Sequence, residues 1–539
     1  MMARPERRVR GTLSRRAFLA GGLALGGSIA TVDLFGAQRS AAAPASVGTP
    51  KRGGTLVAAQ EVDLVSLDPH TNSNFSALQG YEHIYESLTM YDEKMNVVPA
   101  LAEKWEISNG GKTYTFHLRP NVKFHNGQPL TADDVKYSID RVLDPKTASP
   151  WLSWLSSIKE TRIVDPLTVQ MNLDTPYPDL LGSFAALRAS GIMPKGYAER
   201  ENLAIKAIGT GPFKLVEYVP QDHITYTRNA DYWDRSLPYL DGMQFKILTE
   251  ESARLAALRA GQVLYATLSA QGAVQLGTPP GIAVLRAPNA WVSLHYINVS
   301  KKPLDDARVR RALRMAVDTS EVIQKAAFGA AVPSGPIPTG YGDWSLDPKT
   351  LPFNKPDVEG AKKLLAEAGY PNGGFTIEIK CSPQYPEFVA STLVVQNALR
   401  QLNVTTQVVQ MEWGAFVQAR AQEVATAGRE GGEIFASANS FRPGPDGYIY
   451  PYFSIHGEYN DGKYSNPRLE PLIVQARSIS NHDTRRSLYV QIQRTLLDES
   501  PNWWWYAKYN VEALSTKLQA YSQSFTARRI FLKKTWMSG

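Results

Sequence analysis

The stretch that runs from Thr113-Tyr114-Thr115-Phe116-His117-Leu118 to Thr131-Ala132-Asp133-Asp134-Val135 decides the fold class. In its first part, apolar residues alternate with polar ones, which indicates a half-buried strand. In its second part, Thr131 can cap the free amides of a helix and Asp134 can close a capping box. Apolar residues then recur at helical spacing until Asp144-Pro145 ends the helix. A strand followed by a capped helix predicts a mixed α/β protein.

Strands and helices continue to mix along the chain without a regular βα period and without an internal repeat. Strands are expected at Thr55–Ala59, Phe375–Lys380 and Val404–Met411, and helices at Asp305–Phe328 and Val358–Ala368. Gly209-Thr210-Gly211-Pro212-Phe213 predicts a glycine-rich turn that leads into a strand. A chain of 539 residues exceeds one hydrophobic core, so two or more domains are expected.

The N-terminus has the pattern of an export signal. Ser14-Arg15-Arg16-Ala17-Phe18-Leu19 is a twin-arginine motif that follows a basic region. The apolar run after it ends near Ala30, which is too short to cross a bilayer of about 30 Å. The small residues Ala41-Ala42-Ala43-Pro44-Ala45 offer a cleavage site. Residues 1–45 are therefore expected to be a removable signal peptide that directs the protein to the periplasm by the twin-arginine route.

The signal also accounts for most of the positive charge. Residues 1–45 carry +5 of the chain's formal +7, so about +2 remains for the mature protein. No basic run interleaved with aromatic residues remains there, and no nucleic-acid partner is expected. Cys381 is the sole cysteine, so the chain can form no internal disulfide and has no cysteine near the signal to carry a lipid anchor.

Motifs of catalysis and metal binding are missing from the sequence. It has no G-x-S-x-G, P-loop or H-E-x-x-H motif, and Gly209-Thr210-Gly211 lacks the third glycine of a dinucleotide site. The eight histidines are scattered rather than set at ligand spacing. We therefore expect no enzyme, no cofactor and no dedicated metal site. A hydrolase, and a sensor or chaperone that binds without transport, are the competing classes.

Many stretches, taken in order, resemble the dipeptide- and oligopeptide-binding proteins of ABC importers, solute-binding family 5. The matches begin at Gly53-Gly54-Thr55-Leu56, Ser66-Leu67-Asp68-Pro69-His70, Ile84-Tyr85-Glu86-Ser87-Leu88 and Pro99-Ala100-Leu101-Ala102. They continue through the strand and helix quoted first, Phe124-His125-Asn126-Gly127 and Gly209-Thr210-Gly211-Pro212-Phe213. They end with Asp306-Ala307-Arg308-Val309-Arg310-Arg311-Ala312-Leu313, Ala361-Lys362-Lys363-Leu364-Leu365-Ala366-Glu367-Ala368-Gly369, Tyr464-Ser465-Asn466-Pro467 and Arg485-Arg486-Ser487-Leu488-Tyr489.

This resemblance implies a two-lobed periplasmic binding protein of type II, class C, with an extra inserted domain and a hinge of two crossing segments. Lobe I would comprise residues 46–90, 207–293 and 508–539, the inserted domain 91–206, and lobe II 294–507. A peptide or other small ligand would bind between the lobes and shift the population toward a closed form. The membrane permease of the importer would recognise that form, and the binding protein is expected to be a monomer.

The resemblance also implies ligand-contacting residues. Where the local motif matches, they are Ser73, Phe75, Ser76, Trp151, Trp413 and Arg420, together with residues of the run Trp503-Trp504-Trp505-Tyr506. Successive side chains on a strand alternate faces, so the three adjacent tryptophans cannot all face a cleft. Trp503 and Trp505 are the two that we expect in the site.

One position departs from the peptide-binding pattern. Relatives place an aspartate for the peptide's ammonium group where this chain has Phe441 or Arg442, and neither can neutralise a buried ammonium. Asp446 is near but aligns differently. Arg420 and Arg442 would suit an acidic ligand group, because a guanidinium binds a carboxylate with two hydrogen bonds. An oligosaccharide, an opine or an acidic conjugate is therefore the alternative to a peptide.

Overall fold

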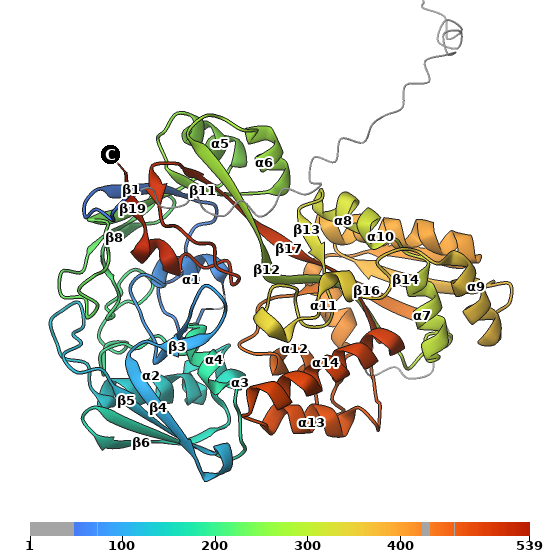
Figure 1. Cartoon of the computed structure of the whole chain (residues 1–539), viewed down its shortest axis with the longest axis horizontal. Helices are drawn as coiled ribbons and strands as arrows, with labels where there is room; N and C mark the ends of the chain where they lie inside the picture. Colours follow the sequence, from blue (N-terminus) through green and yellow to red (C-terminus); the bar gives the residue numbers. More distant parts are fainter. Residues whose placement is uncertain (1–47, 73, 423–431, 458, 539) are drawn as a thin grey trace, which may run out of the picture. The chain divides into compact units, whose positions relative to one another are not determined.

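One large mixed sheet of eleven strands joins distant parts of the chain in the computed structural model, which describes residues 48–72, 74–422, 432–457 and 459–538 (Figure 1). Its order is β15 (Thr405–Gln410), β14 (Thr376–Cys381), β16 (Gly432–Asn439), β12 (Ile282–Ile297), β17 (Asn502–Ser515), β11 (Tyr265–Leu268), β1 (Thr55–Gln60), β10 (Gly242–Ile247), β9 (His223–Arg228) and β8 (Phe213–Val219). Off this path, β13 (Ala331–Pro333) pairs with β17. The predicted signal at 1–45 and Ser73 lie outside the described residues.

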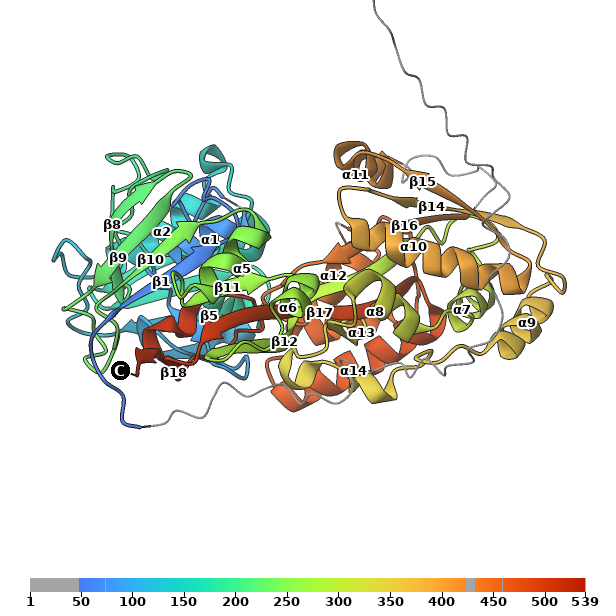
Figure 2. The ribbon, with the colours of Figure 1, turned by 90° about the horizontal axis from the view of Figure 1, so that it is seen from above.

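Two long strands connect the two ends of this sheet. β12 and β17 pair antiparallel from Ile282 and Ser515 to Tyr296 and Asn502, with breaks in register on the way. β11 continues the sheet from the Ser515 end, and β16 continues it from the other (Figure 2). We call β11, β1, β10, β9 and β8 the first half of the sheet, and β16, β14 and β15 the second half. β12 and β17 are the two crossing segments that the sequence predicts.

The first half is built from short strands that pack on the helices α1 (Phe75–Tyr81), α5 (Glu251–Arg259) and α6 (Ala270–Leu276). The predicted turn at Gly209–Phe213 is present and leads into β8. A Cβ atom on Gly209 or Gly211 would collide with the backbone of residues 83–85, so this close approach explains why glycine stands at both positions.

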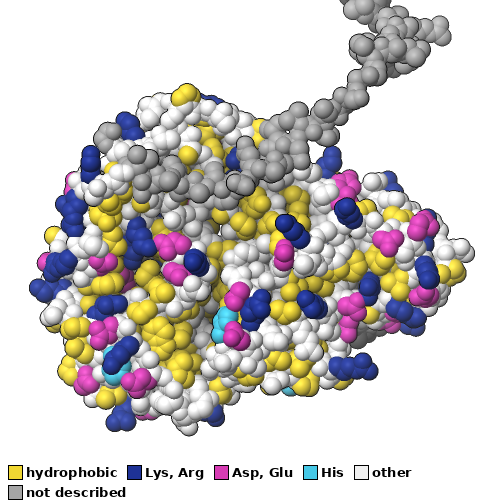
Figure 3. Space-filling view, in the orientation of Figure 1, with side chains coloured by type: hydrophobic (Ala, Val, Ile, Leu, Met, Phe, Trp, Pro, Cys, Tyr) yellow, Lys and Arg dark blue, Asp and Glu magenta, His cyan; other side chains and the backbone are white. Residues whose placement is uncertain are grey.

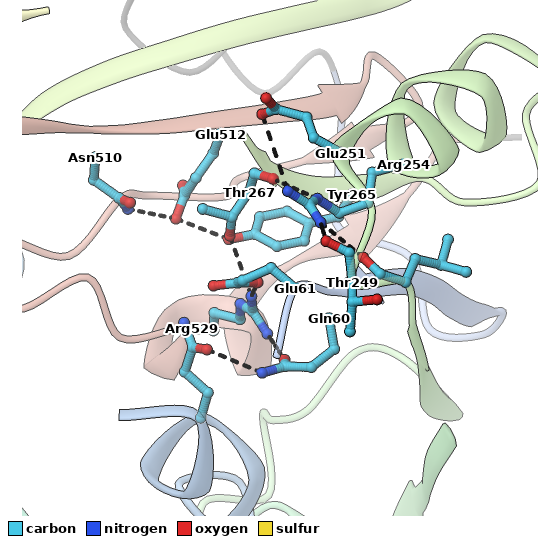
Figure 4. A network of polar contacts seen from close by, with 12 residues as sticks. Gln60, Glu61, Thr249, Glu251, Arg254, Tyr265, Thr267, Asn510, Glu512 and Arg529 are labelled. Carbon is cyan, nitrogen blue, oxygen red and sulfur yellow. Dashed lines mark hydrogen bonds and ion pairs between the residues drawn. The ribbon is translucent and has the colours of Figure 1, made fainter. Parts of the chain in front are cut away.

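A buried polar network ties the C-terminal segment to the first half (Figure 4). Arg529 is fully buried and donates to Glu61 at 2.9 Å, to Gln60 and to Thr267. On β17, Glu512 accepts hydrogen bonds from Tyr265 at 2.8 Å, Tyr521 at 2.9 Å and Asn510 at 2.7 Å. Because these carboxylates find donors inside the protein, their burial is compensated and the network anchors β17.

The second half is flanked by α7 (Ala307–Met315), α8 (Thr319–Ala327), α9 (Val358–Glu367), α10 (Pro386–Leu399), α11 (Trp413–Gln422), α12 (Asp446–Phe453), α13 (Glu470–Ser478) and α14 (His482–Glu499). The single helix expected over Asp305–Phe328 is wrong, because α7 and α8 are separate. The side chain of Asp318 accepts a hydrogen bond from the Ser320 amide, which starts a new helix. The helix that ends before Gly369 is confirmed, with a φ of 94° at that glycine.

Residues 91–206, which we call the insert, contain a separate antiparallel sheet in the order β4 (Ala102–Ser108), β5 (Thr113–Leu118), β7 (Thr168–Leu173) and β6 (Ile158–Asp165). The helices α2 (Ala132–Leu143), α3 (Leu152–Leu155) and α4 (Leu180–Ala185) pack with it. Tyr114, Phe116 and Leu118 are buried together, as predicted. The capping box at Thr131 and Asp134 is present, with the Thr131 amide 2.9 Å from the carboxylate.

Small elements complete the described chain. The strands β2 (Thr89–Tyr91) and β3 (Val97–Pro99) pair with each other, as do β18 (Leu518–Gln519) and β19 (Trp536–Met537). Within the described ranges, we find no helix with the length and apolar character that a membrane span requires.

Candidate functional site

A pocket of about 230 Å³ lies where the insert meets the second half of the sheet. Segment 150–177 lines one side, and segment 442–477 lines the other. Aromatic rings dominate its walls: Trp151, Trp154, Tyr177, Tyr450 and Tyr459. The charged lining residues are Arg442, Asp446 and Arg477. Apolar faces with a few polar groups are typical of sites for small ligands, because the rings supply contact area and the polar groups fix orientation.

Trp151 lines this pocket and is 7% exposed, at the N-cap of α3. Its ring lies 5.0 Å from that of Trp154, and the guanidinium of Arg188 lies 5.1 Å above it. The indole Nε1 is buried and has no hydrogen-bond partner among the described residues. A buried donor without an acceptor lowers the stability of the folded protein.

Arg188 connects two residues of the predicted site. The same guanidinium that covers Trp151 lies 5.5 Å from the ring centre of Phe75, at the start of α1. Ser76, the next residue, is 8% exposed. Sequence reasoning missed Arg188, because no motif marks it and its two aromatic neighbours are distant along the chain.

Arg442 is half-buried on the opposite wall of the pocket. Its guanidinium donates to the hydroxyl of Tyr452 at 2.8 Å, to Ser440 Oγ at 3.2 Å and to the Phe441 carbonyl at 3.2 Å. Within the described ranges, no carboxylate lies within ion-pairing distance of it. Phe441 packs with Tyr91 at 6.0 Å and Tyr341 at 6.3 Å between ring centres. A cationic group thus stands in the pocket with neutral partners only.

Asp446 opens α12 and is 3% exposed. Its carboxylate lies 3.8 Å from Arg477 Nε and accepts a hydrogen bond from Tyr489 at 3.4 Å. Burial, together with the neighbouring charge of Asp179, raises the pKa of Asp446 to about 6. This aspartate is already engaged inside the protein, so it is a poor counter-ion for a ligand ammonium group.

Trp413 and Arg420 lie on α11, away from the walls of this pocket. Trp413 is half-buried, 5.2 Å from Phe416 in a stacked arrangement and 4.8 Å from Tyr385. Arg420 forms an ion pair of 2.9 Å with Asp461. A series of contacts links Arg420 to Arg442. Arg420 lies over the ring of Tyr296, which stacks on the ring of Tyr452, and the Tyr452 hydroxyl accepts a hydrogen bond from Arg442.

The tryptophans of β17 are core residues. Trp503 and Trp505 pack into the cluster around α7, α8 and α10, whereas Trp504 packs into the cluster around α12 and α14. The alternation of faces predicted for this run is confirmed. Trp503 is 1% exposed and Trp505 is fully buried, so we do not retain them in the candidate site.

The surface charge is mixed, as Figure 3 shows, with acidic and basic side chains interspersed over the visible face. Among the residues that the structure describes, no three His, Cys, Asp or Glu side chains are grouped as metal ligands would be. The pocket between the insert and the second half is therefore the candidate site with the clearest chemical character.

Comparison with known proteins bears on the family of the chain. The profile described as "Bacterial extracellular solute-binding proteins, family 5 Middle" matches residues 96–460. The glutathione-binding protein GsiB of Pectobacterium atrosepticum is 29% identical over 446 residues, which cover 81% of this chain and 85% of that protein. Heme-binding protein A of Haemophilus influenzae is 30% identical over 492 residues, which cover 84% of this chain and 86% of that protein.

A solved structure shares the fold. It is the periplasmic binding protein DppA of Helicobacter pylori, associated with an ABC transporter and bound to the peptide STSA. The two chains superpose with a TM-score of 0.70 at 26% identity, over 91% of this chain and 99% of that one. The mixed sheet with two crossing strands is therefore the two-lobed type II binding-protein fold.

Proposed function

The chain belongs to family 5 of the bacterial extracellular solute-binding proteins, and we propose that it captures a peptide or peptide-like ligand for an ABC importer. The observation that carries this proposal is the aromatic pocket between the insert and the second half of the sheet. Ligand bound there contacts both walls at once, so it stabilises the arrangement in which they face each other. That arrangement is the form that the permease would bind.

We further propose that the protein works as a monomer in the periplasm and reaches it by the twin-arginine route. Replacing both arginines, Arg15→Lys with Arg16→Lys, should leave the protein in the cytoplasm as an uncleaved precursor. Cell fractionation and intact-mass measurement test this. Normal export of the double variant would exclude the twin-arginine route.

Ligand binding is tested by calorimetry with two probes, the peptide Ser-Thr-Ser-Ala and glutathione. Tyr450→Ala removes a ring from the pocket wall, and we expect it to weaken binding of the better probe by about tenfold or more. Tyr239→Ala is the matched control, because Tyr239 is also half-buried but lies outside the pocket. Equal losses in both variants would remove this pocket from the proposal.

Native mass spectrometry of the protein purified from the periplasm identifies the ligand that it carries. A bound peptide supports the proposal. A co-purifying sugar, opine or other non-peptide conjugate would replace the peptide as cargo and leave the transport role in place.

A further inference from the structure

Two buried acids meet where the insert touches the second half of the sheet. Asp446 opens α12 and Asp179 belongs to the insert, and the side chain of each is 4% exposed. The Asp179 carboxylate accepts a hydrogen bond from the backbone amide of Asp446 at 3.2 Å. A Cβ atom on Gly444 would collide with the same carboxylate, so the two segments are closely packed. This contact brings a second carboxylate to one that is already buried.

The groups that stabilise the charge of Asp446 lie on its own side of the contact. Arg477 of α13 has its Nε 3.8 Å from the carboxylate, and Tyr489 of α14 donates to it at 3.4 Å. Arg485 of α14 donates instead to Asp179, at 2.6 Å, and its Nη2 is buried with no hydrogen-bond partner among the described residues. Asp446 therefore shares the positive charge of Arg485 with Asp179.

We expect the two sides of this contact to move as parts of different lobes. The insert is tied to the C-terminal segment by Arg528, which donates to the Ala185 carbonyl at 3.1 Å. The same guanidinium pairs with Glu82, which follows α1, at 3.1 Å. Periplasmic binding proteins open and close by hinge motion of their lobes. Opening would thus separate Asp179 from Asp446.

The insert presents two titratable groups to Asp446, the Asp179 carboxylate and the Tyr177 phenol. Burial, together with the charge of Asp179, raises the pKa of Asp446 to about 6 against the opposing charges of Arg477 and Arg485. Burial also raises the pKa of Tyr177, so its phenol is neutral near pH 6. When the walls separate, Asp446 regains water and loses the repulsion, while its partners on α13 and α14 remain beside it. An aspartate in water is ionised at pH 6.

We propose that closing of the two walls takes up a proton at Asp446, so that the pocket holds its ligand more tightly in mildly acidic medium than at neutral pH. This inference rests on the proposed function and adds its regulation. The closed form holds a proton that the open form releases, so acid favours closing. With a pKa of about 6 when closed and 3.8 for an ordinary aspartate, affinity should rise by up to about tenfold from pH 7 to pH 5.

Calorimetry on the full mature chain measures this proton. The probe is Ser-Thr-Ser-Ala, because its terminal groups titrate well away from pH 6. Binding is measured in buffers of different ionisation enthalpy, and the dependence of the heat on the buffer gives the number of protons exchanged. We expect uptake of about half a proton per bound ligand at pH 6, and of about a tenth at pH 7.

Two substitutions shift the uptake in opposite directions. Asp446→Asn cannot take up the proton, so uptake at pH 6 should fall to nearly zero and affinity should change by less than about twofold between pH 7 and pH 5. Arg477→Gln removes a cation that favours the charged carboxylate, so uptake at pH 7 should rise above that of the wild type. Wild type and Arg477→Gln suffice for the test where Asp446→Asn does not fold. Because histidines also titrate in this range, His456→Gln, at an exposed histidine after α12, is the control and should keep the wild-type uptake.

A measurement without ligand follows the two walls themselves. Spin labels at Glu160→Cys in the insert and Arg494→Cys on α14, both exposed, report the distance between the walls. Cys381 is fully buried and stays unlabelled. We expect electron paramagnetic resonance to show a larger population of the short distance at pH 5 than at pH 7, and no such change when Asp446→Asn is added.

The outcomes separate this inference from the proposed function. If the peptide binds without proton uptake at pH 6, or if Asp446→Asn keeps the uptake, the inference is overturned while the proposed function stands. If the peptide does not bind, the peptide assignment loses its support and the label distances decide. A population of the short distance that depends on pH and is made constant by Asp446→Asn supports the inference, and a population that does not change with pH overturns it.

Discussion

Arg485 of α14 donates a hydrogen bond from Nη1 to Oδ1 of Asp179 in the insert at 2.6 Å, and the two side chains are 6% and 4% exposed. The backbone amide of Asp446 donates to the other oxygen of the same carboxylate at 3.2 Å. The hydroxyl of Tyr91 reaches the Pro443 carbonyl close by. The insert and the second half of the sheet are thus joined beside the pocket by a buried ion pair and the hydrogen bonds around it.

Asp179→Asn should destabilise the protein strongly. The substitution leaves the Arg485 cation buried without its counter-ion, which costs about 3–5 kcal/mol of unfolding free energy. Urea denaturation measures the loss. Asp140→Asn is the control, because Asp140 pairs with Lys136 at a site about half exposed to water and should change stability by less than about 1 kcal/mol. Similar losses in both variants would contradict the special role of the buried pair.

Gly182→Ala should disturb the same contact by a steric route. A Cβ atom on Gly182 would collide with the carbonyl oxygen of Pro443 and lie 2.7 Å from the Tyr91 hydroxyl. The backbone cannot move aside as a side chain can, so we expect the free energy of unfolding to fall by about 1–3 kcal/mol. Thermal or urea unfolding measures it. Gly335→Ala is the matched control, since its new atom would meet side chains alone: Leu351 at 3.3 Å, and Gln493 and Leu497 at 4.0 Å. A stable Gly182→Ala protein would show that the two walls are not held this closely.

Trp413→Ala tests the predicted site residue that lies outside the pocket. We expect ligand affinity to fall by more than about tenfold, a loss of roughly 1.4 kcal/mol, with the fold intact. Calorimetry with the better of the two peptide probes measures it, and circular dichroism checks the fold. Unchanged affinity would remove Trp413 from the site and leave it as a partner of Phe416 and Tyr385.

Acid should destabilise the protein through His295. Burial, with the nearby charge of Arg314, lowers the pKa of His295 to about 3, from 6.5 in the unfolded chain. Between these values the unfolded chain binds a proton that the folded protein does not, so stability falls as the pH drops below 6.5. Between pH 6.5 and about pH 5, His295 should lower the free energy of unfolding by up to about 2 kcal/mol.

Urea titrations at several pH values check this contribution. His295→Gln retains an acceptor for the Trp505 indole, and its stability should depend less on pH in that window. His482→Gln, at an exposed histidine, should keep the wild-type slope. Identical slopes in all three proteins would contradict the assignment.

Local patterns in the sequence predicted much of the fold. Alternation placed Tyr114, Phe116 and Leu118 in one core, and it divided Trp503, Trp504 and Trp505 between two. The break between α7 and α8 was missed, because apolar residues keep helical spacing up to Val317. The cap that ends this run depends on one aspartate, Asp318.

The candidate site was predictable only in part. Trp151, Arg442 and Asp446 meet in one pocket, although the predictions of these residues rested on separate stretches of the chain. Arg188 could not be found, because its role depends on two rings that only the folded chain brings to it. The ion pair that neutralises Arg420 could not be predicted for the same reason, because its partner Asp461 belongs to a distant segment.

The pairing of β12 with β17 is broken in register at two places, and the wider break follows Pro288. Between the pairs Pro288–Tyr509 and Val292–Ala507, β12 has three residues where β17 has one. The amide of Ala290, freed from the ladder, bonds instead to the Phe525 carbonyl at 3.0 Å. Paired strands resist bending where their hydrogen bonds are regular, so we expect the sheet to bend most easily at this mismatch. With a second break between Ser293 and Leu294, the stretch from Pro288 to Leu294 is where we expect one end of the sheet to bend against the other.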